Sequence, residues 1–322
     1  MSSPAESQHN HDIKVLCITG AARSGSTILA NILGQYPGFF TVGETHQLWT
    51  AGLVDQRLCG CGRKLTECRV WSAVFEEGFG SLGKVDFARV QLARDHCSRT
   101  RGLLLSHVPV RKGKWEHDRA EYLRAVEQLY AAIVACTGCK VIVDTSKLPM
   151  YGYLLNASTL VQPYIVHLVR DPRATAYSWL RRKPVRTAKG TSHMPSRGVL
   201  RSALEWSVQN ATTEVLKAHA FPRAMTLLYE DFVAEPHESV KAIVRFTGEP
   251  VPDSPVPPSG VFTLGVTHTV VGNPNRFETG AVSIREDAEW KSGLNPRDKA
   301  VINAVCWPWL IRYRYARNKA HG

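Results

Sequence analysis

Residues Ile13–Thr27 read IKVLCITGAARSGST, and this stretch decides the fold. It begins with an apolar run that predicts a buried strand, and a glycine-rich turn follows. The next segment, ILANILGQY, starts at Ile28 and predicts a helix. The backbone N–H groups of such a turn converge on an anion, and the helix dipole adds favourable potential. The stretch therefore predicts a strand, a turn and a helix N-terminus that together bind a phosphate-like group.

The turn keeps the glycine spacing of a nucleotide-binding P-loop but lacks its lysine. Gly20 and Gly25 are separated by four residues, and Ser26 stands where a nucleotide hydrolase places lysine. The nearby cation is Arg23, inside the turn. A turn that merely connects strand to helix is the alternative, but an arginine among small polar residues suits an anion better. The turn therefore predicts binding of a nucleotide phosphate without the usual triphosphate chemistry.

The composition is ordinary for a globular protein, apart from a basic surplus. Its 322 residues include 40 Lys and Arg against 28 Asp and Glu, a formal net charge of +12. This surplus fits an anionic ligand, a nucleic acid or simply a solvated surface, and charge alone does not separate the three. No apolar run approaches the ~20 residues that span a bilayer. We therefore expect a cytoplasmic protein without stable membrane insertion.

The chain predicts one domain after a short tail. Residues 1–12 are polar and lack the apolar and basic stretches of a signal peptide, which predicts a flexible tail. Neither an internal repeat nor a convincing linker interrupts the rest, so residues 13–316 are expected to form a single domain. Helices are expected over 85–106, 116–136 and 231–248, and a long loop over 250–276.

Further strands are expected within 39–44, 140–149, 164–173 and 225–229, and helices lie between them. This alternation predicts an α/β fold, a P-loop-like parallel sheet flanked by helices on both faces. Ligands of such sheets bind beyond the carboxyl ends of the strands. Polar residues follow the expected strands at that edge, namely Arg23, Glu44, Asp144 to Lys147, Arg170 and Tyr229.

Three segments resemble the signatures of sulfotransferases that use 3'-phosphoadenosine 5'-phosphosulfate (PAPS). They are GAARSGST from Gly20, LVRDPRATAYS from Leu168 and LLYEDFVAEP from Leu227. Their order and spacing carry the resemblance, which spans about residues 13–315. It implies in-line transfer of a sulfuryl group from PAPS to a hydroxyl of a small-molecule, lipid or carbohydrate acceptor. It implies no required metal, because Arg23, Lys147 and the turn amides can neutralise the charge that develops.

The resemblance assigns the two ends of the donor to different segments. The turn would bind the 5'-phosphosulfate through Arg23, Ser24, Gly25, Ser26 and Thr27. Arg170 and Ser178 keep the family spacing for the 3'-phosphate. Arg182 lies one helical turn further on and can join them at the 3'-phosphate. A solvated surface cation is a nearly equal interpretation of Arg182. Tyr229 could bond the 3'-phosphate by family analogy or simply pack in the core. We interpret Asp171 as a helix cap.

Glu44 is the expected general base, since the acceptor proton must go to a nearby group. Its segment VGETHQLW resembles the Gly-Glu context after the second strand in tyrosylprotein and related sulfotransferases. Cytosolic sulfotransferases use a histidine instead, and Lys147 in TSKLP stands at its place. Lysine is charged at neutral pH, so Lys147 suits the bridging oxygen and leaving phosphate, as does Arg23. A salt bridge from Glu44 to Arg23 or Lys147 is the alternative for Glu44, and His46 is the competing base.

The cysteines form two groups. Cys59, Cys61 and Cys68 lie within ten residues, and Cys136 and Cys139 form a second pair. Structural zinc takes four ligands, and the first group lacks a fourth. Buried thiols that brace a loop are the favoured interpretation, and a metal that links both groups stays an alternative. The CxCG turn and the Cys68–Trp71 segment also recur in bacterial sulfotransferase-like sequences, without a role assigned to them.

Two other function classes fit the sequence less well. For a P-loop nucleotide kinase-like phosphotransferase, the sequence lacks the lysine expected after Gly25. Asp144 is the only candidate for a Mg²⁺-binding acid. A nucleic-acid-binding protein is disfavoured because the basic residues form no stripe with interleaved aromatics. Residues 268–290 resemble the late loop of bacterial sulfotransferases that closes over the nucleotide, and its candidates Asn273, Arg276, Arg285 and Lys291 are not distinguished by sequence. The acceptor and the oligomeric state are not set either.

Overall fold

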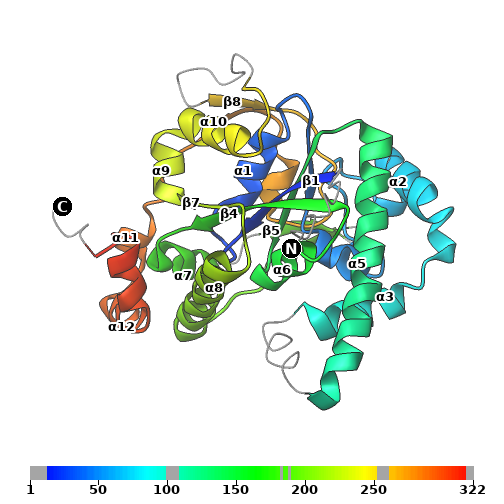
Figure 1. The fold of residues 1–322 in the computed structure, drawn as a ribbon. Helices are drawn as coiled ribbons and strands as arrows, with labels where there is room; N and C mark the ends of the chain where they lie inside the picture. The colour runs from blue at the N-terminus through cyan, green and yellow to red at the C-terminus, as the bar shows by residue number, and fades with distance from the viewer. Residues whose placement is uncertain (1–12, 99–108, 182–183, 188–189, 252–260, 317–322) are drawn as a thin grey trace, which may run out of the picture.

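The computed structural model describes residues 13–98, 109–181, 184–187, 190–251 and 261–316. Its centre is a five-stranded sheet in which every pairing is parallel (Figure 1). The strands, in spatial order, are β2 (Phe39–Gly43), β3 (Val141–Lys147), β1 (Ile13–Thr19), β4 (Val161–Val169) and β7 (Ala224–Leu228). The expected α/β class with a parallel sheet is confirmed.

Helices bury both faces of the sheet. The side chains of β1 point alternately to the two faces and pack in two apolar clusters. Val15 and Cys17 pack with one group of helices, and Leu16 and Ile18 pack with another. The first group comprises α2 (Arg69–Phe79), α3 (Phe87–Cys97), α5 (Pro109–Thr137) and α6 (Pro149–Leu155). The second comprises α1 (Ser26–Leu33), α9 (Tyr229–Ala234) and α10 (Pro236–Phe246), which lie above the sheet in Figure 1.

A third cluster packs the remaining helices beside the end of β4. Trp206, Ile302 and Cys306 are fully buried in it. Its helices are α7 (Pro172–Leu180), α8 (Val199–His219), α11 (Trp290–Gly293) and α12 (Pro296–Arg312). Two small hairpins complete the fold, β5 (Pro184–Thr187) with β6 (Gly190–His193) and β8 (Val261–Leu264) with β9 (Gly280–Ser283). Among the described helices, none is long and apolar enough to cross a membrane.

Short helical turns lie between these elements. They are η1 (Thr45–Gln47), η2 (Leu48–Gly52), η3 (Leu65–Glu67), η4 (Leu82–Lys84) and η5 (Pro274–Phe277).

Several element boundaries differ from the sequence prediction for local reasons. The expected helix over 231–248 is two helices, because the chain leaves helical geometry at Glu235 (φ −131°) and restarts with Pro236. The expected long loop over 250–276 contains β8, which pairs with β9, and η5. The expected helix over 85–106 ends at Cys97 as α3, and residues 99–106 lie outside the described part of the chain.

Candidate active site

The turn after β1 has a backbone that its neighbours fix. Gly20 has φ of 126°, its N–H donates to the Lys147 carbonyl at 3.2 Å, and a Cβ there would clash with the Leu168 carbonyl oxygen. Gly25 has φ of 89°, and a Cβ would come within 2.6 Å of the Tyr229 ring. Only glycine fits both conformations without strain. The turn is therefore held between β3, β4 and the start of α9.

The carboxyl ends of the strands enclose a pocket of about 430 Å³, which we call the donor pocket. Its volume is in the range of small-molecule sites. Of its described lining residues, five are Arg or Lys and two are acidic, so the pocket favours an anion. Most of the expected site residues line it: Arg23, Gly25, Ser26, Thr27, Glu44, Lys147, Arg170, Ser178 and Tyr229.

Two expected donor-binding residues are placed differently. Ser24 is buried and its hydroxyl donates to the Ala21 carbonyl at 2.7 Å, so its side chain braces the turn. Its backbone remains part of the turn that begins α1. No side chain in the described structure caps the first N–H groups of α1. These groups therefore stay available to an anion. Arg182 lies outside the described residues.

Arg23 enters the donor pocket with hydrogen-bond donors to spare. Its guanidinium stacks on Trp179, with 4.5 Å from Cζ to the ring centroid, and Nη1 lies 2.9 Å from the Met194 sulfur. Nε and Nη2 are buried, and neither has a hydrogen-bond partner among the described residues. Burial and the charge of nearby Arg197 lower the pKa of Arg23. A bound anion would satisfy these donors and offset the cost of burying them.

Arg170 directly follows β4 and forms the opposite wall. Its guanidinium lies over the Tyr229 ring at 4.4 Å, and Nη1 donates to the Arg23 carbonyl at 3.1 Å. Ser178 lies further along α7, buried and at the same pocket. The neighbouring Asp171 accepts from the Arg173 N–H at 2.8 Å, which confirms its role as the helix cap. Arg170 and Ser178, which keep the family spacing for the 3'-phosphate, therefore line one pocket.

An acidic residue that the sequence did not point to sits against this wall. The Asp287 carboxylate lies 3.1 Å from Arg170 Nη2 and 2.7 Å from Arg181 Nη2. Burial alone would raise the pKa of Asp287, but the two arginines lower it below the ordinary value. The carboxylate therefore stays ionised and occupies a position where two cations converge. No spacing signal links it to Arg170, since the two residues are more than a hundred positions apart.

Glu44 and Lys147 face each other at the ends of β2 and β3. Gly43 (φ 82°) ends β2, so Glu44 precedes the 3₁₀ turn η1 instead of continuing the strand. Its carboxylate forms an ion pair with Lys147 and accepts a second hydrogen bond from Gln47. Burial raises the pKa of Glu44, but the Lys147 charge opposes it and the pKa ends below its ordinary value. The salt bridge proposed as one alternative for Glu44 is therefore present.

A second cavity of about 190 Å³ shares this ion pair with the donor pocket. We call it the polar pocket, because Gln47, Ser146, Ser202, Glu205 and Gln209 line it. His46 also lines it, and burial lowers the pKa of His46 to about 4. Its ring is neutral at pH 7 and a weaker base than an ordinary histidine. Glu44 therefore lies where the two cavities meet.

The four late-loop candidates have different positions. Asn273 lines the donor pocket, and its N–H donates to Thr27 Oγ1 at 3.3 Å. Arg276 is buried and donates to the carbonyls of Leu58 and Gly272, so it braces the loop. Arg285 and Lys291 line a third cavity of about 790 Å³, which also contacts Arg170 and Tyr229.

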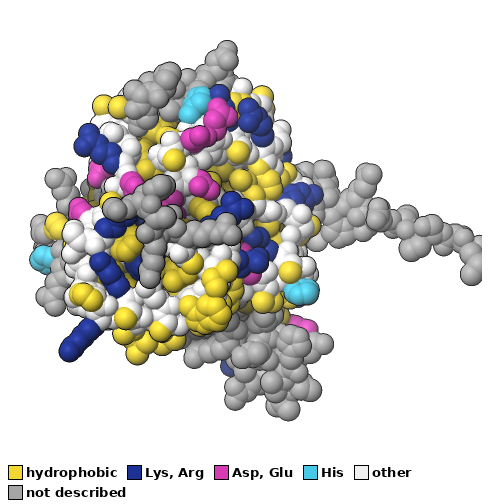
Figure 2. Space-filling view, turned by 90° about the vertical axis from the view of Figure 1, so that its left-hand side faces the viewer, with side chains coloured by type: hydrophobic (Ala, Val, Ile, Leu, Met, Phe, Trp, Pro, Cys, Tyr) yellow, Lys and Arg dark blue, Asp and Glu magenta, His cyan; other side chains and the backbone are white. Residues whose placement is uncertain are grey.

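The residues that would support other functions are placed elsewhere. Asp144 is buried, accepts from the Tyr130 hydroxyl at 2.7 Å and the Ser146 N–H at 2.6 Å, and is not among the described residues that line the donor pocket. Asp144 therefore takes part in a buried hydrogen-bond network. On the face shown in Figure 2, basic side chains are interspersed with acidic and apolar ones and form no continuous stripe.

Comparisons with known proteins identify the family. The sequence model described as "Sulfotransferase family" matches residues 16–253, most of the chain. No curated protein sequence matches significantly. Among solved structures, the sulfotransferase domain from the curacin biosynthetic pathway aligns with 16% identity and a TM-score of 0.50 over 92% of this chain and 97% of that one. The sulfotransferase domain from the Synechococcus PCC 7002 olefin synthase aligns with 19% identity and a TM-score of 0.46 over 92% and 96%. The first likeness supports the fold, and the family match covers the turn, Arg170 and Tyr229: the chain belongs to the sulfotransferase family.

Proposed function

We propose that the protein transfers a sulfuryl group from PAPS to a hydroxyl of an acceptor. One observation carries this proposal: the Glu44–Lys147 pair lies between a cationic pocket and a polar one. A transferase of this kind needs an anion site for the donor, a second site for the acceptor and a base between them. We assign the activity to a single domain, residues 13–316.

The proposed donor has one orientation in this proposal. The N–H groups at the start of α1, with Ser26 and Thr27, would hold the 5'-phosphate. Arg170 and Ser178 would hold the 3'-phosphate, where a guanidinium can give two parallel bonds. The unpartnered donors of Arg23 would then be available to the bridging oxygen of the phosphosulfate. The nucleoside would extend past Tyr229 toward the third cavity, with Arg285 and Lys291 at its far end.

The reaction is a displacement at sulfur. The acceptor oxygen bonds to sulfur while the bond from sulfur to the bridging oxygen breaks, and adenosine 3',5'-bisphosphate leaves. The acceptor proton goes to Glu44, and the charge that develops on the leaving oxygen is stabilised by Lys147 and Arg23. Lys147 thus pairs first with the Glu44 carboxylate and then with the leaving group. When it turns from Glu44 to the leaving group, burial again raises the pKa of Glu44, which strengthens the base at the moment it is needed.

The acceptor is expected to enter through the polar pocket. Its lining is rich in amide, hydroxyl and carboxylate groups, which favours a polar, sugar-like acceptor over a lipid. Two segments of the chain contribute differently to these pockets. Arg197, at the end of the 184–197 stretch, lines both pockets, whereas no described lining residue of the polar pocket comes from 53–136. Residues of α8 take that place.

A labelled donor tests the proposal. The protein is incubated with PAPS carrying labelled sulfur and a panel of carbohydrates, small polar alcohols and lipid alcohols, and label on each acceptor is measured. We expect label on polar acceptors and none when Glu44→Gln replaces the wild type. A loss of roughly 10²–10⁴-fold is typical when a general base is removed. Transfer of phosphate from labelled ATP to an acceptor would instead establish a kinase and contradict the proposal.

His46 provides the control for the Glu44 assignment. Since its ring nitrogen Nδ1 is buried without a partner among the described residues, His46→Asn is expected to keep most of the turnover. Turnover that survives Glu44→Gln and disappears in His46→Asn would move the base to His46.

A further inference from the structure

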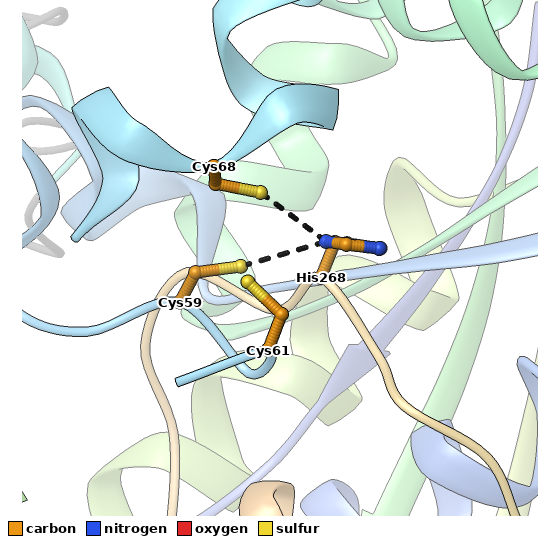
Figure 3. A group of neighbouring side chains, drawn as sticks. All are labelled: Cys59, Cys61, Cys68 and His268. Atoms are coloured by element: carbon orange, nitrogen blue, oxygen red, sulfur yellow. Dashed lines mark hydrogen bonds between the residues drawn. The ribbon is translucent and has the colours of Figure 1, made fainter. Parts of the chain in front are cut away.

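Four side chains that bind soft metals converge away from the donor pocket (Figure 3). Cys59, Cys61 and Cys68 lie between η2 and α2, and His268 lies some two hundred positions later. One ligand atom from each falls within 4.8 Å of every other. The His268 Nδ1 atom is 3.2 Å from the Cys68 sulfur and 3.8 Å from the Cys59 sulfur. His268 is thus the fourth group that the sequence alone did not place beside the cysteines.

We propose that these four residues bind one structural zinc ion. Three thiolates and one imidazole are a common ligand set of structural zinc. Bonds of about 2.0–2.3 Å in a tetrahedron place neighbouring ligand atoms roughly 3.5–3.8 Å apart, which the observed separations approach. Cys136 and Cys139 belong to no such group among the described residues, so the ion does not link the two cysteine groups. A disulfide would use only two of the three thiols. It would not account for the positions of His268 and the third thiol beside them.

The local backbone positions three of the four ligands. Residues 58–64 fold into a tight hairpin. In it the Cys59 N–H donates to the Arg63 carbonyl at 2.7 Å, and the Gly62 N–H donates to the Cys59 carbonyl at 2.8 Å. Gly62 has φ of 82°, which allows the chain to reverse between Cys61 and Cys68. Cys68 is held at the start of α2. Three of the ligands are therefore presented by a short, rigid segment.

The fourth ligand is fixed by its backbone. The His268 carbonyl accepts from Trp71 Nε1 at 2.7 Å, and the next carbonyl, of Thr269, accepts from the Gly60 N–H at 2.9 Å. A Cβ on Gly60 would lie 2.6 Å from the Thr267 carbonyl oxygen, so the hairpin touches the segment around His268 directly. Both sides of His268 are thus attached to the cysteine segment, and its ring faces the sulfurs.

The ion would brace the active site without taking part in the chemistry. From His268 the chain runs along the end of β2, where Val270 N–H donates to Val42 and Val271 accepts from the Glu44 N–H. The same segment then reaches the donor pocket, where the Asn273 N–H donates to Thr27 Oγ1. None of the four ligands is among the described residues that line that pocket. A closed four-ligand site has no open position for a substrate, which fits a structural role.

Metal content tests the proposal, and it is measured without nucleotide, so the result does not depend on the proposed function. The full chain is purified under reducing conditions, supplied with Zn²⁺, and desalted. Mass spectrometry of the metal is expected to find about one zinc per chain. Cys59→Ser, Cys68→Ser and His268→Asn should each reduce this to a small fraction. Cys136→Ser, at an exposed cysteine outside the group, should keep it.

One further variant and a spectrum keep the test decisive if a variant folds poorly. His268→Cys supplies a fourth thiolate, and it should retain zinc where His268→Asn does not. Wild-type protein loaded with Co²⁺ should show the strong ligand-field and thiolate charge-transfer absorption of a tetrahedral sulfur-rich site.

Three results would overturn the proposal. The first is a folded wild-type chain that stays metal-free after Zn²⁺ is supplied. The second is a disulfide among Cys59, Cys61 and Cys68 in the reduced preparation. The third is zinc retained in Cys59→Ser, which would place the ion elsewhere, for example at the group His117, Asp118 and Glu121.

Discussion

Two residues of the candidate active site adopt a backbone conformation that side chains rarely take. Arg23 has φ of 72° and Lys147 has φ of 64°. Such a conformation costs about 1–3 kcal/mol and persists where the surroundings hold it. The N–H of Gly20 holds the Lys147 carbonyl, and Arg170 holds the Arg23 carbonyl. The two cations are thereby presented to the same pocket in a conformation that these hydrogen bonds hold.

Lys147→Met should lower turnover and move the acid limb of the pH profile upward. A charge stabiliser contributes on the order of 10²–10³-fold. Glu44 must be ionised to accept the proton, so the rate falls as pH drops through the pKa of Glu44. In the wild type this pKa lies below the ordinary range of about 4.3, and without Lys147 burial raises it. The measurement is kcat/KM against pH for both proteins, because this ratio reports the pKa of Glu44 in the free enzyme. An acid limb at the same or a lower pH in the variant would refute the pairing.

Asp287→Asn should tighten binding of adenosine 3',5'-bisphosphate. Asp287 pairs with Arg170, which the 3'-phosphate is proposed to use, so removing the carboxylate removes a competitor. A partly exposed ion pair of this kind is worth up to ~1 kcal/mol, and we expect a Kd roughly 2- to 5-fold lower by calorimetry. Glu289→Gln is the matched control, because Arg181 is the only ion-pair partner of Glu289 among the described residues. Weaker binding in Asp287→Asn would show that the carboxylate supports the ligand instead.

At the scale of elements, the turn between β1 and α1 depends on Tyr229 at the start of α9. Gly25→Ala places a Cβ against the Tyr229 ring at a φ that alanine rarely adopts. We expect a loss of about 1–3 kcal/mol of unfolding free energy and of most bisphosphate affinity. Gly113→Ala is the control, since that glycine lies in α5 with open space around it and alanine favours a helix. Chemical denaturation and calorimetry measure both effects. Unchanged binding in Gly25→Ala would separate this turn from the ligand site.

The elements themselves were largely predictable, because buried parallel strands are apolar runs and their polar ends mark one edge of the sheet. The strands around Ile13, Phe39, Val141 and Met225 were expected for this reason. The β8–β9 hairpin was not, since β8 is only four residues long in a segment rich in proline and glycine. Its pairing depends on a partner strand beyond the intervening loop. A short strand of this kind has no local pattern strong enough to predict it.

At the scale of the whole molecule, the sequence indicated the residues that follow strands and missed those brought in from a distance. Arg23, Glu44, Lys147 and Arg170 were predictable, because a parallel sheet gathers its strand ends at one edge. Asp287 and His268 were not, because they reach their partners through tertiary packing that leaves no spacing signal. The expectation that no catalytic metal is required rests on the first set, and the proposed zinc site rests on the second.

The measurement that tests the account most directly is thermal unfolding with two competing ligands. A nucleotide that binds only the folded chain raises Tm by mass action. We expect adenosine 3',5'-bisphosphate to raise the Tm of the wild type, Arg170→Ala to abolish most of that rise, and ATP with Mg²⁺ to leave Tm unchanged. A rise with ATP and Mg²⁺ and none with the bisphosphate would contradict the account.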